Sequence, residues 1–128
     1  MEGSTTDQLT QRVHRQATIA PISEVAGLLQ ELLSRRLTAF IAGVNDGKTV
    51  TRWASGEVAA IRDHEMEQRL RTTYEIAQLL MSSDAPRTVK AWFIGLNPQL
   101  GDTSPAEAIR EGRLRETLAA ARAFTVGG

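Results

Sequence analysis

The segment Leu37–Gly56 has the sequence LTAFIAGVNDGKTVTRWASG. Its first half carries apolar residues at helical spacing: Leu37, Phe40, Ile41 and Val44. This spacing predicts an amphipathic helix from about residue 35 to 44. Asn45-Asp46-Gly47 is a strong turn signal, because these residue types tolerate left-handed dihedrals and Asx residues cap helices. A second short helix is expected over residues 48–54, ended by Ser55-Gly56. A helix, a tight turn and a second helix, in this order, form a helix-turn-helix.

The second of these helices has an apolar and a polar side. Its apolar positions, at i, i+3 and i+4, are Val50, Trp53 and Ala54. In a helix-turn-helix the second helix lies in the major groove, where Arg binds guanine bidentately, Thr contacts several base edges and Lys suits a phosphate. Trp53 would be buried whether or not DNA binds, and short helical hairpins without DNA are common. The expected DNA-binding residues are Lys48, Thr49, Thr51 and Arg52.

The distribution of charge gives this interpretation only weak support. The chain has 15 Lys and Arg against 15 Asp and Glu, whereas nucleic-acid binders are often basic overall. Residues 35–62 contain five basic residues and two acidic ones (Arg35, Arg36, Lys48, Arg52 and Arg62; Asp46 and Glu57). This local excess suits a short DNA-reading helix, but it does not predict strong non-specific DNA binding by a monomer.

Helical spacing continues over most of the chain and predicts an all-α fold, a helix-turn-helix bundle followed by a small helical C-terminal domain. We expect an N-terminal segment over residues 1–20, with a polar helix over 7–16. The helix-turn-helix domain should span residues 21–82, with Ser23 as the N-cap of its first helix. It should also contain a long helix over 63–81, whose apolar stripe comprises Met66, Leu70, Thr73, Tyr74, Ala77 and Leu80.

The expected C-terminal domain, residues 83–128, begins after the linker Ser82–Pro86. Ser104 with Pro105 and Glu107 forms a capping-box arrangement at the start of a short helix. A last helix, rich in Ala, is expected from Leu114 to about Phe124, with a flexible tail after it.

Several classes of protein are excluded or disfavoured. The chain has 128 residues and no cysteine, which excludes disulfides, a zinc finger and a cysteine nucleophile and suits the reducing cytoplasm. No apolar run is long enough for a membrane span, and no secretion signal is evident. The only histidines, His14 and His64, accompany no nucleophile motif. No phosphate-binding loop, dinucleotide fingerprint or metal-ligand spacing occurs. We therefore expect no enzyme, no cofactor and no metal.

Two parts of the chain resemble a known family. Val50-Thr51-Arg52-Trp53 followed by Gly56 is similar to the recognition helix of Xre-class repressors. Trp92-Phe93-Ile94-Gly95-Leu96-Asn97-Pro98, followed by Leu100, Gly101, Pro105, Ala106, Gly112 and the helix Leu118–Phe124, resembles the toxin-binding domain of Xre/MbcA/ParS-type antitoxins. The resemblance covers roughly Leu28 to the end. The additional Gly47 in the turn and the low basicity depart from the pattern, and the first of these leaves the docking angle open.

The resemblance implies an antitoxin of a type II pair, which binds a RES-type, NAD-degrading toxin and represses its own operon through DNA binding. The residues near the C-terminus of such antitoxins block the toxin, and the matching segment here is Arg122–Gly128. A stand-alone transcription regulator without a toxin is the alternative, and a scaffold that no longer binds DNA is a third possibility. Because helix-turn-helix proteins usually read two half-sites, a homo-oligomer is expected.

The aromatic residues of the C-terminal third are the candidate partner surface. A chain of this length cannot easily bury Trp92, Phe93, Ile94, Leu96 and Phe124 together. We expect Trp92 and Leu96 to lie in the core, whereas Phe93 and Phe124 suit either the core or an interface. The expected partner-binding residues are Phe93, Arg122, Phe124, Thr125 and Val126.

Overall fold

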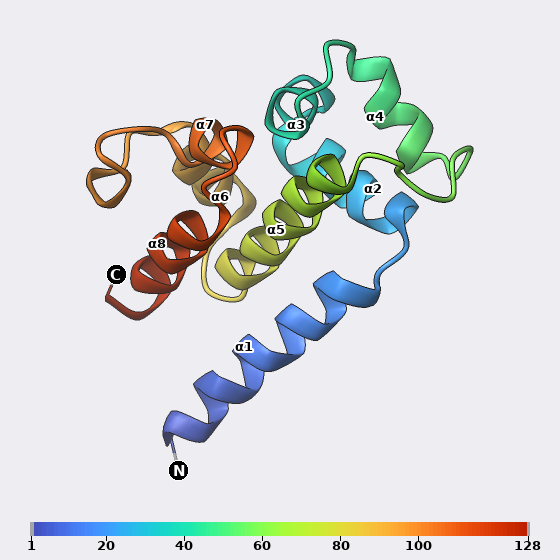
Figure 1. Cartoon of the computed structure of the whole chain (residues 1–128). Helices are drawn as coiled ribbons and strands as arrows, with labels where there is room; N and C mark the ends of the chain where they lie inside the picture. The colour runs from blue at the N-terminus through green and yellow to red at the C-terminus, as the bar shows by residue number, and fades with distance from the viewer. Residues whose placement is uncertain (1, 128) are drawn as a thin grey trace.

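The computed structural model of the chain describes the backbone of residues 2–127 and the side chains of residues 7–127. The described part contains helices and no β-strand, so the predicted all-α class is confirmed. Along the chain the helices are α1 (Glu2–Ile19), α2 (Ile22–Leu33), α3 (Arg35–Ala42), α4 (Gly47–Ala54), α5 (His64–Met81), α6 (Pro86–Ile94), the 3₁₀ turn η1 (Pro98–Leu100), α7 (Pro105–Arg110) and α8 (Leu114–Gly127) (Figure 1). No helix among the described residues combines the length and the apolar character that a bilayer crossing needs.

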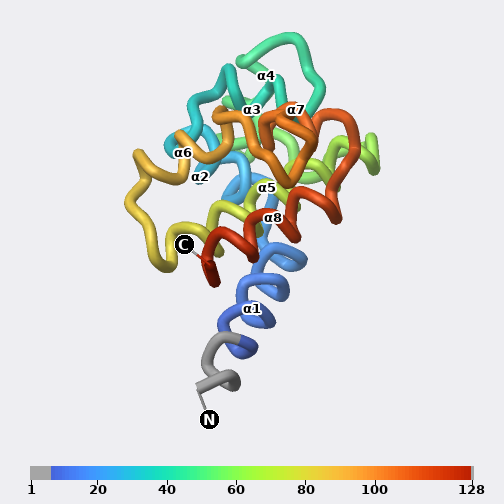
Figure 2. Tube along the Cα trace, turned by 90° about the vertical axis from the view of Figure 1, so that its left-hand side faces the viewer, coloured from blue at the N-terminus to red at the C-terminus, as the bar shows by residue number. Residues whose placement is uncertain are grey.

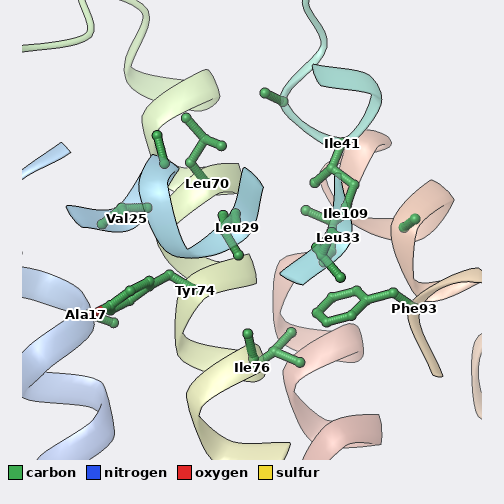
Figure 3. Packing of buried hydrophobic residues seen from close by; sticks show 14 of the residues in the cluster. Ala17, Val25, Leu29, Leu33, Ile41, Leu70, Tyr74, Ile76, Phe93 and Ile109 are labelled. Carbon is green, nitrogen blue, oxygen red and sulfur yellow. The ribbon is translucent and has the colours of Figure 1, made fainter. Parts of the chain in front are cut away.

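Helices α2 and α5 form the centre of the molecule. Leu29 and Leu33 of α2 and Leu70 and Ile76 of α5 are fully buried, and side chains from α1, α3, α6 and α7 surround them (Figure 3). One cluster of buried side chains therefore extends from α1 to α8, across both predicted domain boundaries at residues 20/21 and 82/83. The predicted apolar stripe of α5 is buried apart from Met66, which is half-buried.

The helix starts agree only partly with the sequence. Ser104 caps α7 as predicted, since its side chain accepts a hydrogen bond of 3.1 Å from the Glu107 amide. The prediction that Ser23 caps α2 is wrong. The N-cap is Pro21, whose carbonyl accepts hydrogen bonds from the amides of Glu24 and Val25, and no side chain caps this helix. Pro21 lies in the extended region that an N-cap adopts, so the chain enters the helix before Ser23 is reached.

Both ends of the chain are more helical than predicted. Helix α1 extends beyond the expected residues 7–16 and projects away from the rest of the molecule (Figure 2). It is anchored by Val13 and Ala17, which are buried, and by Arg71, which donates to the carbonyls of Ala17 and Ala20. Helix α8 continues to Gly127, so the predicted flexible tail is wrong for residues 125–127, and Gly128 lies outside the described residues.

Candidate functional site

The segment Leu37–Gly56 forms two short helices joined by a tight turn. Helix α3 ends at Gly43, whose φ of 90° is left-handed and favours glycine, and α4 begins after Asp46. The Asp46 carboxylate accepts a hydrogen bond of 2.9 Å from the Lys48 amide and thereby caps α4. Val50 and Trp53 are buried, as the spacing predicts, and they hold α4 against α2 and α3. The opposite face of α4 is therefore directed outward, at the edge of the molecule (Figure 1).

The four residues predicted to bind DNA lie along this helix. Lys48, Thr51 and Arg52 are exposed and Thr49 is half-buried. The Arg52 guanidinium donates a hydrogen bond of 2.6 Å to Glu57, and the exposed fractions of the two side chains are 60% and 59%. Exposed ion pairs contribute little free energy, so Arg52 can leave Glu57 for another acceptor.

Two further polar residues adjoin α4 and were not predicted as site residues. The Thr51 hydroxyl donates to the side-chain oxygen of Gln30 on α2, at 2.8 Å, which places an amide able to contact adenine beside α4. The side chain of Arg35 packs at the start of α4, where a Cβ on Gly47 would lie 3.2 Å from the Arg35 Cγ. Arg35 is detectable from the local charge, whereas Gln30 is not, because its position depends on how α2 packs on α4.

The C-terminal third brings together three aromatic rings. Trp92 contacts Phe93 edge to face, with ring centroids 5.3 Å apart, and its centroid lies 6.4 Å from that of Phe124. Trp92 and Phe124 are half-buried, whereas Phe93 is fully buried and points into the core near Leu33 and Ile109 (Figure 3). The expectation that Phe93 forms part of a partner surface is therefore corrected, because its ring is inaccessible in this conformation.

Leu96 is the second correction in this region. It was expected in the core, but its exposed fraction is 74%, and that of Ile94 is 55%. The reason is that α6 ends at Gly95, whose backbone is extended, so the helical spacing that would bury Leu96 stops there. Leu100 of η1 is buried instead, in a small cluster with Ala108 and Ala120. Two large apolar side chains, Ile94 and Leu96, are consequently left on the surface close to Trp92 in sequence.

The end of α8 separates the other predicted partner-binding residues. Phe124 lines a groove of about 390 Å³ with Trp92 and with Pro98 and Gln99 of η1. Arg122, Thr125 and Val126 line a different groove of about 550 Å³, between α8 and the helices α1 and α5. Val126 is 78% exposed. The predicted residues thus occupy two adjacent surfaces of one helix end rather than a single pocket.

Arg113, just before α8, forms local ion pairs with Glu116 and, at 3.8 Å, with Glu111. The side chain of Arg113 donates a hydrogen bond of 2.9 Å to Glu116. This hydrogen bond and the accompanying charge interaction lower the pKa of Glu116 and raise that of Arg113. Arg113 also donates to the carbonyl of Leu100, at 3.3 Å, so the pair joins the start of α8 to η1. Both pKa shifts favour the charged forms of Arg113 and Glu116, so the ion pair persists at neutral pH.

Neither histidine lies in an arrangement typical of catalysis. His64 is exposed at the start of α5, and His14 of α1 lies 3.1 Å from the buried carboxylate of Glu75. Among the described residues no group of three or more His, Cys, Asp or Glu side chains could hold a metal ion. No family model, no curated protein and no solved structure matches the chain. Its function is therefore argued from the two surfaces described above and from the sequence pattern.

Proposed function

We propose that the protein is an antitoxin-type, DNA-binding regulator. In this proposal α4 binds operator DNA, and the C-terminal third binds and neutralises a RES-type, NAD-degrading toxin. The observation that carries it is the outward polar face of α4, held by buried Val50 and Trp53 after a capped turn. The proposal places the protein in the cytoplasm with its DNA.

The DNA-binding part is supported by the dimensions and chemistry of α4. This helix has 8 residues, which suits insertion of one short helix into a major groove about 12 Å wide. Arg52 is suited to guanine, Thr51 with Gln30 to base edges, and Lys48 and Arg35 at the start of the helix to phosphates. One such helix makes few base contacts, so two copies of the chain per operator are part of the proposal.

The partner-binding part is supported by exposed apolar side chains in the C-terminal third. Ile94, Leu96 and Val126 are exposed, and Val126 lines the groove between α8 and the helices α1 and α5. Large exposed apolar side chains are typical of protein interfaces. The same segment carries the resemblance to the toxin-binding domain, from Trp92 to Pro98. Figure 1 shows α4 on the right of the molecule and α6 and α8 on the left, so the proposal has DNA and a protein bind on separate sides.

The alternative is a regulator that binds DNA through the same helix but has no toxin. In that case the Ile94–Leu96 surface would serve association between copies of the chain, because exposed apolar surface in a dimeric repressor commonly lies at the dimer interface. The two functions agree on α4 and differ only in the occupant of the C-terminal surface.

The deciding experiment is co-expression with the gene adjacent to its own, scored by growth and by co-purification. Growth arrest by the neighbour alone, rescue by this protein and a common elution peak are the expected results. Deleting residues 122–128 should remove rescue and leave binding to the upstream DNA in place. A harmless neighbour that does not co-purify would contradict the antitoxin function and favour the stand-alone regulator.

A further inference from the structure

The end of α3 is held by arginines from two other helices. The last carbonyls of a helix have no partner within the helix and carry partial negative charge, so they attract cationic donors. The guanidinium of Arg69, on α5, donates to the Ala42 carbonyl twice, at 3.0 and 2.8 Å. A Cβ on Gly43 would lie 2.9 Å from that guanidinium. Glycine is favoured here by its positive φ, whereas the close approach alone would be relieved by a shift of the flexible Arg69 side chain.

The second arginine comes from the C-terminal third. Arg110, at the end of α7, donates a hydrogen bond of 2.5 Å to the Phe40 carbonyl. Its guanidinium also lies 4.7 Å from the centroid of the Phe40 ring, a cation–π geometry. The preceding residue, Ile109, is buried in the same cluster as Ile41 of α3 (Figure 3). Helix α7 is thus joined to α3 both by core packing and by a polar contact at the end of the helix.

The contact between Arg110 and Phe40 lies only a few residues before the start of α4. The residues that follow α3, Gly43 to Asp46, are the turn from which α4 begins, and the Asp46 side chain caps α4. A change in the last turn of α3 therefore changes the start of α4 within four residues. Phe40 and Arg110 are both exposed, so their contact adds little to the core. Its main physical effect is to fix the end of α3.

We infer that Arg110 is a positioning residue for α4, and that the C-terminal third is therefore a part of the DNA-binding unit and not only a site for a partner. The inference deepens the proposed function and rests on it for its DNA readout. According to this inference, residues on both sides of the predicted domain boundary at 82/83 contribute to DNA binding. Arg69 acts at the same helix end from α5, but it lies on the other side of that boundary, so Arg110 is the residue that distinguishes the two possibilities.

The test compares full-length Arg110→Ala, Arg110→Lys and the control Arg87→Ala. Arg87 is an exposed residue of α6 with no hydrogen bond or ion pair to any described side chain, so its removal changes the net charge equally. Two readouts are measured: amide hydrogen exchange of residues 43–49, and affinity for a duplex of the DNA immediately upstream of the gene. Arg110→Ala should raise the exchange rate and weaken DNA binding, each about tenfold, as expected for a lost charged hydrogen bond.

Arg110→Lys should recover part of both effects, because the ammonium keeps its charge at the helix end without the planar geometry of the guanidinium. Arg87→Ala should change neither readout beyond about twofold. Unchanged exchange in Arg110→Ala overturns the inference whatever happens with DNA, and so does raised exchange with unchanged DNA affinity. If the wild-type protein does not bind the duplex, the proposed function fails in its DNA part, and the exchange readout alone then decides whether Arg110 fixes the α3–α4 turn.

Discussion

Helix α4 and the end of the C-terminal third expose opposite kinds of surface. On α4 the apolar side chains are buried and the outward face is polar or charged, as in Lys48 and Arg52. Around η1 and the end of α8, large apolar side chains are exposed, including Leu96 and Val126. A polar, cationic face suits a polyanion and loses affinity as salt is added, whereas an apolar face suits another protein and is nearly indifferent to salt. The two regions therefore predict two different partners for one small fold.

The contrast between the two surfaces requires that Phe93 belongs to the core and that Phe124 is available at the surface. Phe93→Ala should lower the free energy of unfolding by about 3–5 kcal/mol, because it leaves a large cavity in the core. The matched change Phe124→Ala, at a half-buried ring, should cost less than about 2 kcal/mol. Urea denaturation followed by circular dichroism measures both. An equal loss of unfolding free energy in the two variants would contradict the placement of Phe93 in the core and of Phe124 at its edge.

The apolar surface itself is tested by Leu96→Glu. Because this side chain is 74% exposed, the free energy of unfolding should change by less than about 0.5 kcal/mol. Burying a carboxylate at an interface is costly, so affinity for the co-purifying partner should fall at least about thirtyfold, or about 2 kcal/mol. Gln11→Glu adds the same charge at an exposed position of α1 that lines neither groove, and it serves as the control. If Leu96→Glu binds the partner with unchanged affinity in calorimetry, Leu96 does not lie in the interface.

The polar surface is tested by Arg52→Ala. Loss of a side chain able to contact a guanine should reduce affinity for the upstream DNA by about 1–3 kcal/mol and relax its sequence preference. Arg62→Ala removes the same charge from the exposed segment between α4 and α5 and should weaken binding much less. Fluorescence anisotropy over a range of salt concentrations separates the two. An unchanged affinity in Arg52→Ala would contradict the assignment of α4 to the major groove.

Sequence spacing predicted the helices well and the exposed residues of the C-terminal third less well. Val50 and Trp53 lie within one regular helix, so their spacing alone shows which side is buried. Leu96 follows Gly95, where the helix ends, and beyond that residue helical spacing no longer predicts which side chains face the core. Gln30 and Arg110 act on α3 and α4 from distant parts of the chain. Their contacts arise from how whole helices pack, which single-sequence patterns do not contain.

The smallest expected effect concerns Glu57, the carboxylate that pairs with Arg52 among the described side chains. Glu57 accepts a hydrogen bond of 2.6 Å from the Arg52 guanidinium and adds a negative charge beside the face of α4. In Glu57→Gln that charge is removed, so binding to the upstream DNA no longer requires Arg52 to leave an ion pair. The affinity should rise about two- to fivefold at low salt, and this gain should fade as salt screens the pair.

Stability provides the control, because an exposed ion pair is worth less than about 1 kcal/mol and its loss should leave the unfolding free energy nearly unchanged. Glu65→Gln removes an equal charge from the first turn of α5, where no contact with Arg52 exists among the described side chains, and should raise DNA affinity less. If Glu57→Gln weakens DNA binding instead, the ion pair would be a device that holds Arg52 in its binding conformation. Glu57 would then belong to the DNA-binding surface. The face of α4 would in that case use an acidic residue to orient the arginine that contacts the polyanion.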